Sequence, residues 1–255
     1  MRQSVITLEK FYASPLGATA RNMAARRLGS LWPDLSGQDV LGFGYCAPYL
    51  RPYMKAANRV VLAMPGGQGA VAQSGQRGII ACLTAEDLLP FSDARFDNVL
   101  CVHGVEETPD LSELLRELWR VTRPEGRIVV IASNRSGMWA RSDKSPFGAG
   151  RPFSRTQLRG ALNAAGFVPT VWSGALYAPP IRKLTGAGFS HGCERFGETV
   201  WPSFSGLVLV EAIKRLYAEP KGTAKKLVMR PSFATRPIAN RTATKRTATK
   251  RKVHE

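Results

Sequence analysis

Residues 87–132, DLLPFSDARFDNVLCVHGVEETPDLSELLRELWRVTRPEGRIVVIA, contain one complete strand–helix–strand unit. Residues 99–102 and 128–131 are short apolar runs rich in β-branched side chains, which is typical of buried strands. Between them, leucines recur at helical spacing from Leu111 to Leu118, and Asp110 with Glu113 has the pattern of a helix start. Two buried strands joined by a helix predict a parallel pair with a right-handed crossover.

The flanking sequence continues this alternation of strands and helices. Helices are predicted at residues 8–12 and 17–31, and another follows Ser154 and ends at Gly166. The glycine- and glutamine-rich residues 66–78 predict a loop with room for one helical turn. Further strands are expected within residues 38–48, where the first strand and its turn lie, and at residues 59–65, 79–83, 168–172 and 205–212.

Three features of the central stretch resemble the second half of class I S-adenosylmethionine (SAM)-dependent methyltransferases, in particular their type 11 domain. They are the turn at residues 89–91, the strand entry at residues 96–97 and the helix exit at residues 120–126. With its flanks, the resemblance runs from about Val40 to about Lys214. It implies an α/β fold: a doubly wound, mostly parallel seven-stranded sheet, Rossmann-like, with helices on both faces and an antiparallel last strand.

The resemblance also implies SAM as the cofactor, bound where the parallel strands end. The first two strand ends supply five candidate cofactor-binding residues: Gly42, Phe43, Gly44, Tyr45 and Met64. Gly42 stands where the family usually has an acidic residue, and Cys46 and Pro48 replace two of its three glycines. Met64 stands where an Asp or Glu usually grips the ribose hydroxyls. Because hydrogen bonds to a charged group contribute ~1.5–3 kcal/mol, that loss predicts roughly ten- to a hundredfold weaker binding.

Three more candidates follow the third and fourth strands: Asp87, Leu88 and His103. In the family a carboxylate near Asp87 often contacts the adenine, and Asp87 is favoured over Glu86; the alternative is two solvated acids on a loop. His103 would lie beside the transferable methyl group, where it lines the site, acts as a base, or is merely a hydrogen-bonded histidine at a strand end. Residues 101–104 lack the [Asn/Asp]-Pro-Pro-aromatic signature, which counts against methylation of nucleobase amines.

The long loop at residues 133–155 leaves a central strand and is expected to cover the pocket. It carries five Lys/Arg against Asp143, a net +4. We expect the substrate to be a small molecule. The charge of this loop has two interpretations: an anionic substrate, or a solvated basic loop. Methyl transfer is a displacement in which positioning supplies much of the rate, so the sequence singles out no catalytic residue.

The first residues have no apolar segment of signal-peptide length, and nowhere are 18 apolar residues consecutive. We therefore expect a cytoplasmic protein that does not enter a membrane. Four cysteines without CxxC spacing predict free thiols. His191 and Cys193 offer two metal ligands where zinc needs three or four, so no metal site is predicted.

Charge divides the chain unevenly. Eleven Lys/Arg and one acid follow Pro220, a net +10, which leaves +7 of the total +17 for residues 1–220. We expect a helical cover over residues 1–36, which either helps to hold the cofactor or only packs, then a methyltransferase-like domain over residues 37–217. Residues 218–255 predict a disordered basic tail, which either solubilises the chain or contacts nucleic acid without reading sequence, through residues 221–255.

Three functions remain open on this basis. The first is a SAM-dependent methyltransferase. The second is a methyltransferase-fold protein without activity that acts as a binding or regulatory module, because carboxylates are missing at Gly42 and Met64. The third is a nucleic-acid-associated protein anchored by its tail. We favour the first.

Overall fold

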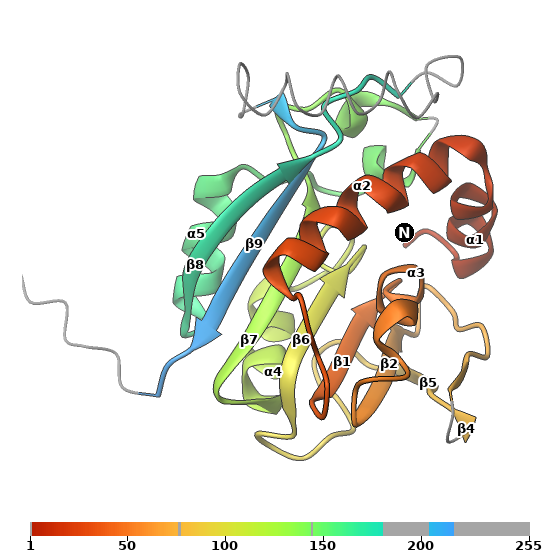
Figure 1. Ribbon diagram of the computed structural model, residues 1–255. Coiled ribbons are helices and arrows are strands. Elements are labelled where there is room, and N and C mark those ends of the chain that lie inside the picture. Colours follow the sequence, from red (N-terminus) through yellow and green to blue (C-terminus); the bar gives the residue numbers. More distant parts are fainter. Residues whose placement is uncertain (1, 76–77, 144, 181–203, 217–255) are drawn as a thin grey trace, which may run out of the picture. The chain divides into compact units, whose positions relative to one another are not determined.

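Seven strands form one mostly parallel sheet in a computed structural model, which describes residues 2–75, 78–143, 145–180 and 204–216 (Figure 1). Their order is β5-β2-β1-β6-β7-β9-β8, and β9 runs antiparallel to both β7 and β8. The strands are β1 (Asp39–Gly44), β2 (Arg59–Pro65), β5 (Ala81–Thr84), β6 (Phe96–Val102), β7 (Thr122–Ser133), β8 (Phe167–Ala175) and β9 (Leu207–Lys214). The predicted doubly wound sheet with an antiparallel last strand is confirmed.

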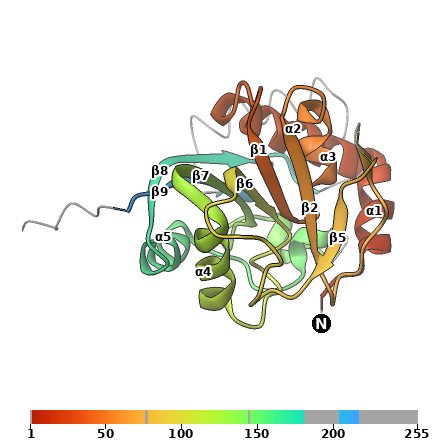
Figure 2. The ribbon, with the colours of Figure 1, turned by 90° about the horizontal axis from the view of Figure 1, so that it is seen from below.

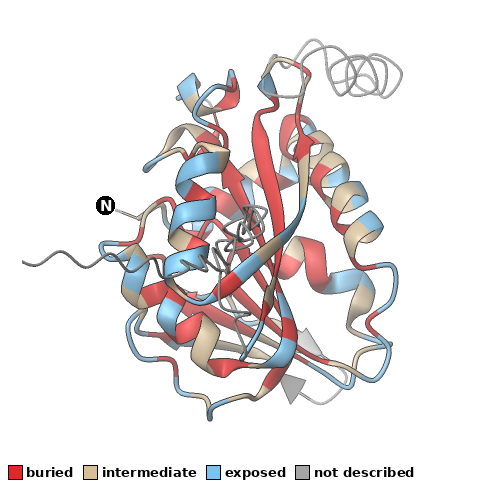
Figure 3. Cartoon of the chain, turned by 90° about the vertical axis from the view of Figure 1, so that its left-hand side faces the viewer, coloured by how far each residue is buried: buried red, intermediate tan, exposed pale blue. Residues whose placement is uncertain are grey.

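Helices cover both faces of this sheet, as Figure 2 shows. They are α1 (Val5–Ala13), α2 (Pro15–Leu31), α3 (Ala47–Leu50), α4 (Leu111–Val121) and α5 (Arg155–Ala164). The side chains of α1, α2 and α3 join one buried apolar cluster, and those of α4 and α5 join the other. Successive residues of the central strands alternate between the two clusters, so these strands are buried on both sides (Figure 3).

Local capping explains where several helices begin. The Asp110 carboxylate accepts the backbone N–H groups of Ser112 and Glu113 at the start of α4. Ser154 and Gln157 form a reciprocal capping box at the start of α5. Each satisfies N–H groups that have no partner inside the helix. The predicted starts of α4 and α5 are confirmed, whereas α1 and α2 begin earlier than predicted, at Val5 and Pro15.

The turn at residues 89–91 is attached to α4 by two of its polar side chains. Arg120 donates to the carbonyl groups of Leu89 and Phe91, and Glu117 accepts the Leu89 N–H at 2.8 Å. Glu117 and Arg120 also form an ion pair at 2.8 Å, in which Glu117 is buried. This attachment fixes the loop that leads from β5 into β6.

Several predicted strands have other bounds in the structure: β8 and β9 end later than predicted, at Ala175 and Lys214, and the third strand begins later. Ile80 donates its N–H to Gln73, so the third strand starts at Ala81 instead of residue 79. Residues 78–79 instead pair antiparallel with residues 74–75, as the short strands β4 (Gly78–Ile79) and β3 (Ser74–Gly75). Earlier in the same loop, the N–H groups of Gln68 and Gly69 donate to the Pro65 carbonyl, so one turn with helix-like hydrogen bonds is present as well.

Short 3₁₀ turns complete the described elements, at Arg51–Tyr53, Trp139–Arg141 and Pro146–Gly148. Cys46 and Cys101 are buried and free, and Cys82 is half-buried and free. None of the helices in the described ranges is long and apolar enough to span a membrane. The predicted tail, along with His191 and Cys193, lies outside the described residues.

Candidate functional site

The carboxyl ends of β1, β2, β5 and β6 meet at one edge of the sheet, and the turn after β1 is packed tightly there. Gly44 has φ +84°, and a Cβ atom at this position would lie 2.2 Å from the Val102 carbonyl oxygen. Only glycine fits such a backbone at such a close approach. Tyr45 then donates its N–H to the same Val102 oxygen at 2.8 Å. The glycine that the sequence retains is therefore the one required by the turn.

Above this turn lies a cluster of aromatic rings, which we call the aromatic cluster: Tyr12, Tyr45, Tyr49, His103 and Phe147. The Tyr12 hydroxyl lies 2.9 Å from Nε2 of His103 and 2.9 Å from the Tyr49 hydroxyl. Its ring stacks on Tyr45 with centroids 5.4 Å apart, and the His103 ring stacks on Phe147 at 4.9 Å. Residues from α1, the β1 turn and the end of β6 thus form one buried polar–aromatic network.

Burial keeps this network uncharged. It lowers the pKa of His103 to about 3 and raises the pKa of the Tyr12 hydroxyl well above its usual value. His103 is also in the left-handed region, with φ 51°. In this conformation the His103 ring is buried at a strand end and hydrogen-bonded to Tyr12.

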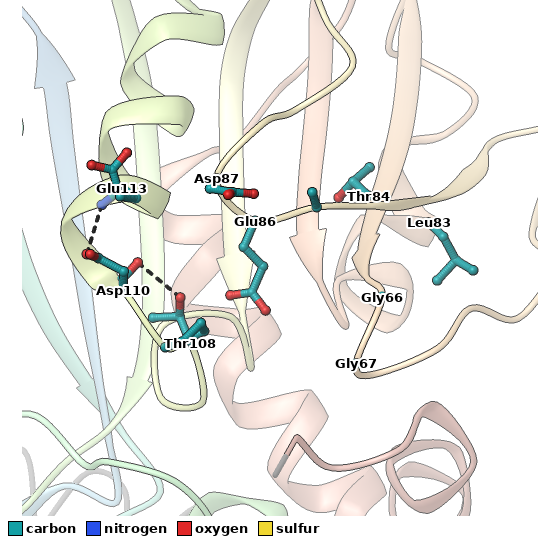
Figure 4. A pocket seen from close by; sticks show the side chains of 11 residues that line it. Gly66, Gly67, Leu83, Thr84, Glu86, Asp87, Thr108, Asp110 and Glu113 are labelled. Carbon is teal, nitrogen blue, oxygen red and sulfur yellow. Dashed lines mark hydrogen bonds between the residues drawn. The ribbon is translucent and has the colours of Figure 1, made fainter.

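A cleft of about 690 Å³ lies at the same edge of the sheet (Figure 4). Its walls come from the ends of β2 and β5 and from the segment that starts α4, namely residues 66–67, 83–87, 108–110 and 113. The carboxyl groups of Glu86 and Asp87 both line it. The volume is within the range of pockets that hold small molecules.

Arg2 crosses from the N-terminus into this region. Its guanidinium binds both carboxylate oxygens of Glu86, at 2.7 and 2.5 Å, and its side chain is only 4% exposed. It also donates to the carbonyl oxygens of His103 at 3.1 Å and Gly104 at 2.9 Å. Three acceptors at the end of β6 and after β5 therefore hold one cation.

The residues that follow Arg2 keep the chain in place. The Gln3 N–H donates to the Glu107 carboxylate at 2.6 Å, and the Val5 N–H donates to the Gln68 carbonyl at 2.8 Å. We call residues 2–12 the N-terminal segment. It contacts two of the residues for which the sequence predicts cofactor contacts, Tyr45 and His103.

The predicted cofactor residues fall into two groups. Gly44, Tyr45 and His103 lie together at the aromatic cluster, and Asp87 lines the cleft. Phe43 and Met64 are fully buried in the core, so in this conformation neither residue is accessible to another molecule.

Gly42 and Leu88 lie away from the cleft. A Cβ atom on Gly42 would lie 2.7 Å from the side chain of Cys46, so the missing carboxylate would have no room there. Leu88 is 71% exposed and is not among the residues that line the cleft.

Sequence reasoning missed Arg2, Tyr12, Tyr49 and Glu106. The Glu106 carboxylate accepts the Ser133 N–H at 2.9 Å, while its second oxygen is buried without a hydrogen-bond partner among the described residues. Burial raises the pKa of Glu106 to about 7. No local pattern marks these residues, because each acts through contacts with distant segments.

Comparison with known proteins agrees with this geometry. Residues 41–130 match the family described as a methyltransferase domain. The ubiquinone/menaquinone biosynthesis C-methyltransferase of Geotalea daltonii is 37% identical over 67 residues, 26% of this chain and 28% of that protein. The malonyl-(acyl-carrier protein) O-methyltransferase of Erwinia billingiae is 32% identical over 115 residues, 44% of this chain and 45% of that protein. The chain thus spans less than half the length of these curated relatives.

A solved structure extends the likeness to most of the chain. The SAM-dependent methyltransferase of Thermotoga maritima, a possible histamine N-methyltransferase, has a TM-score of 0.56 at 16% identity. The match covers 83% of this chain and 96% of that one. At this identity the likeness concerns the fold.

Proposed function

We propose that this chain, whose residues 41–130 match a methyltransferase domain, is a class I SAM-dependent methyltransferase that transfers a methyl group from SAM to a small-molecule acceptor. The observation that carries the proposal is the set of acceptors that holds Arg2. A carboxylate and two backbone carbonyls converge beside a cleft at the carboxyl ends of parallel strands. Ligands of open α/β sheets bind at this edge.

These acceptors suit SAM chemically, because SAM carries a sulfonium and an ammonium group. Glu86 and the carbonyls of His103 and Gly104 already bind a guanidinium, so another cation can take the same acceptors once Arg2 withdraws. The cleft of about 690 Å³ leaves space for the adenosine end, with Asp87 as the proposed acceptor for the adenine amino group. SAM supplies an electrophilic methyl group, and the residues of the chain bind SAM, orient its methyl group and exclude water.

The acceptor molecule is proposed at the level of its class. The two curated relatives are named for ubiquinone/menaquinone biosynthesis and for a malonyl group on a carrier protein, so they do not agree on one acceptor. The net +4 of residues 133–155 favours an acceptor with negative charge.

Calorimetric titration of the full chain with SAM and with S-adenosylhomocysteine tests the proposal first. We expect micromolar binding of both. Asp87→Asn should weaken it roughly fivefold, because hydrogen bonds to charged groups exceed those to neutral ones by about 1 kcal/mol. Glu125→Gln is the matched control, because Glu125 is exposed and does not line the cleft. Labelled SAM with a small-molecule extract should then give a labelled low-mass product.

A second candidate function rests on the missing carboxylates. Gly42 and Met64 stand at the two positions where the family usually has an acid, and neither has room or charge to replace it. A methyltransferase fold that serves only as a binding module predicts no binding of SAM up to millimolar concentration. That result would reject the methyltransferase proposal.

A further inference from the structure

A second cleft, of about 680 Å³, shares Pro109 and Asp110 with the first but differs from it in charge. Arg135 and Arg151 line it, together with the polar side chains of Ser112 and Gln157. Both arginines are exposed, and neither forms an ion pair with another residue in the described part of the chain. Two guanidinium groups at one concave surface are thus available for a ligand.

Backbone pairing brings the two arginines to the same cleft. Residues 134 and 153 form a parallel bridge, the Arg135 N–H donates to the Phe153 carbonyl at 3.0 Å, and the Phe153 N–H donates to Ser133 at 2.9 Å. The Arg151 N–H donates to the Glu106 carbonyl at 2.8 Å. The loop at residues 133–155 therefore folds back on itself here, and backbone hydrogen bonds fix the main-chain positions of Arg135 and Arg151.

Little negative charge opposes the two arginines at this cleft. Asp110 lies on the rim, but its carboxylate accepts the N–H groups of Ser112 and Glu113 at 2.8 and 3.1 Å. The start of α4, an eleven-residue helix, also lies at this cleft, and a helix N-terminus carries a partial positive charge. Two guanidinium groups against one engaged carboxylate favour a dianion over a neutral ligand.

We infer that Arg135 and Arg151 bind a phosphate or diphosphate group of the methyl acceptor. Guanidinium groups bind phosphate oxygens in bidentate pairs, and a phosphate offers more oxygens to two such groups than a carboxylate does. Ser112 and Gln157 supply neutral donors at the same surface. That the anion belongs to the methyl acceptor rests on the proposed function; the anion site itself does not.

Titration of the full chain with inorganic pyrophosphate, in chloride buffer, tests this inference. We expect Arg135→Gln with Arg151→Gln to weaken pyrophosphate binding at least tenfold. The matched control is Arg116→Gln with Arg159→Gln, which removes two exposed charges from α4 and α5 outside the cleft and should change the affinity less than twofold. Because the basic tail is present in every variant, its own phosphate contacts cancel in the comparison.

Two outcomes would overturn the inference. One is the same pyrophosphate affinity in the wild type and the Arg135/Arg151 variant, which includes the absence of binding in both. The other is citrate binding as tightly as pyrophosphate, which would show a general carboxylate site. Protection of Arg135 and Arg151, but not Arg116, from phenylglyoxal in the presence of pyrophosphate would localise the bound anion independently.

SAM titration of the same variants separates this inference from the proposed function. The Arg135/Arg151 variant should bind SAM within twofold of the wild type, because neither arginine lines the first cleft. If SAM does not bind but pyrophosphate does, the anion site stands and the proposed function fails. If SAM binds and the arginines do not affect pyrophosphate, the anion site alone fails.

Discussion

Two buried ionisable side chains near the candidate site respond to pH in opposite directions. Burial raises the pKa of Glu106 to about 7 and lowers the pKa of His103 to about 3. In both cases the interior favours the neutral form, because a charge that leaves water without a partner is costly. One carboxylate oxygen of Glu106 accepts the Ser133 N–H, and the other has no hydrogen-bond partner in the described part of the chain.

Replacing Glu106 by Gln should change how stability depends on pH. The folded protein keeps the Glu106 proton up to about pH 7, whereas the unfolded chain releases it from about pH 4.5. The contribution of Glu106 to stability is therefore full below the lower value and is lost as the pH rises through the higher one. Relative to the wild type, Glu106→Gln should gain up to about 3 kcal/mol between these pH values, at 1.36 kcal/mol per pKa unit.

Urea unfolding of both proteins at pH 5, 6, 7 and 8 measures this difference. His103 titrates in both proteins, so its opposite effect cancels in the comparison. Glu9→Gln, at an exposed position of α1, should follow the wild type at every pH. A free-energy difference between Glu106→Gln and the wild type that stays constant with pH would show that Glu106 is ionised in the folded state.

At the scale of elements, the N-terminal segment lies beside the proposed cofactor site. Its contacts reach the ends of β1, β5 and β6, through Arg2, Gln3 and Tyr12. Arg2 holds the acceptors that we propose for the cationic end of SAM. The segment and the cofactor therefore compete for the same groups.

Arg2→Ala should bind SAM at least about fivefold more tightly than the wild type. SAM would then no longer have to break charge-assisted hydrogen bonds, which contribute ~1.5–3 kcal/mol each. Lys10→Ala removes an exposed cation from α1 and should leave the affinity unchanged. Calorimetric titration measures all three proteins. Equal affinity of Arg2→Ala and wild type would show that Arg2 does not stand in the path of the cofactor.

Local elements were predictable from the sequence, whereas contacts between distant segments were not. The helix α4 and the strands β6 and β7 were predictable, because periodicity and capping are local signals. The Gly44 turn was predictable as well, since its backbone needs glycine. The Tyr12–His103 and Arg2–Glu86 contacts were not, because they join residues 91 and 84 positions apart. Such pairs depend on the complete fold rather than on neighbouring residues.

At the scale of the whole molecule, most of the net positive charge belongs to residues outside the described part of the chain. Of the net +17, +10 follows Pro220, outside the part of the chain that the structure describes. Within the described residues several acids form ion pairs with arginines, among them Asp39, Glu86 and Glu117. The charge after Pro220 is thus the part of the molecule expected to contact polyanions.

We expect the full chain to bind duplex DNA without sequence preference, with an affinity that falls steeply as salt increases. Replacing the six Lys/Arg between residues 241 and 252 by Ser should reduce the slope of log affinity against log salt by up to about five, at roughly 0.9 per phosphate contact. Changing the three arginines in that range to Lys keeps the charge and should keep the slope. Fluorescence anisotropy from 50 to 300 mM salt measures both variants. A Ser variant with the wild-type slope would place the DNA contact on residues before 241, and no binding of the wild type at 50 mM would reject a role in nucleic-acid association.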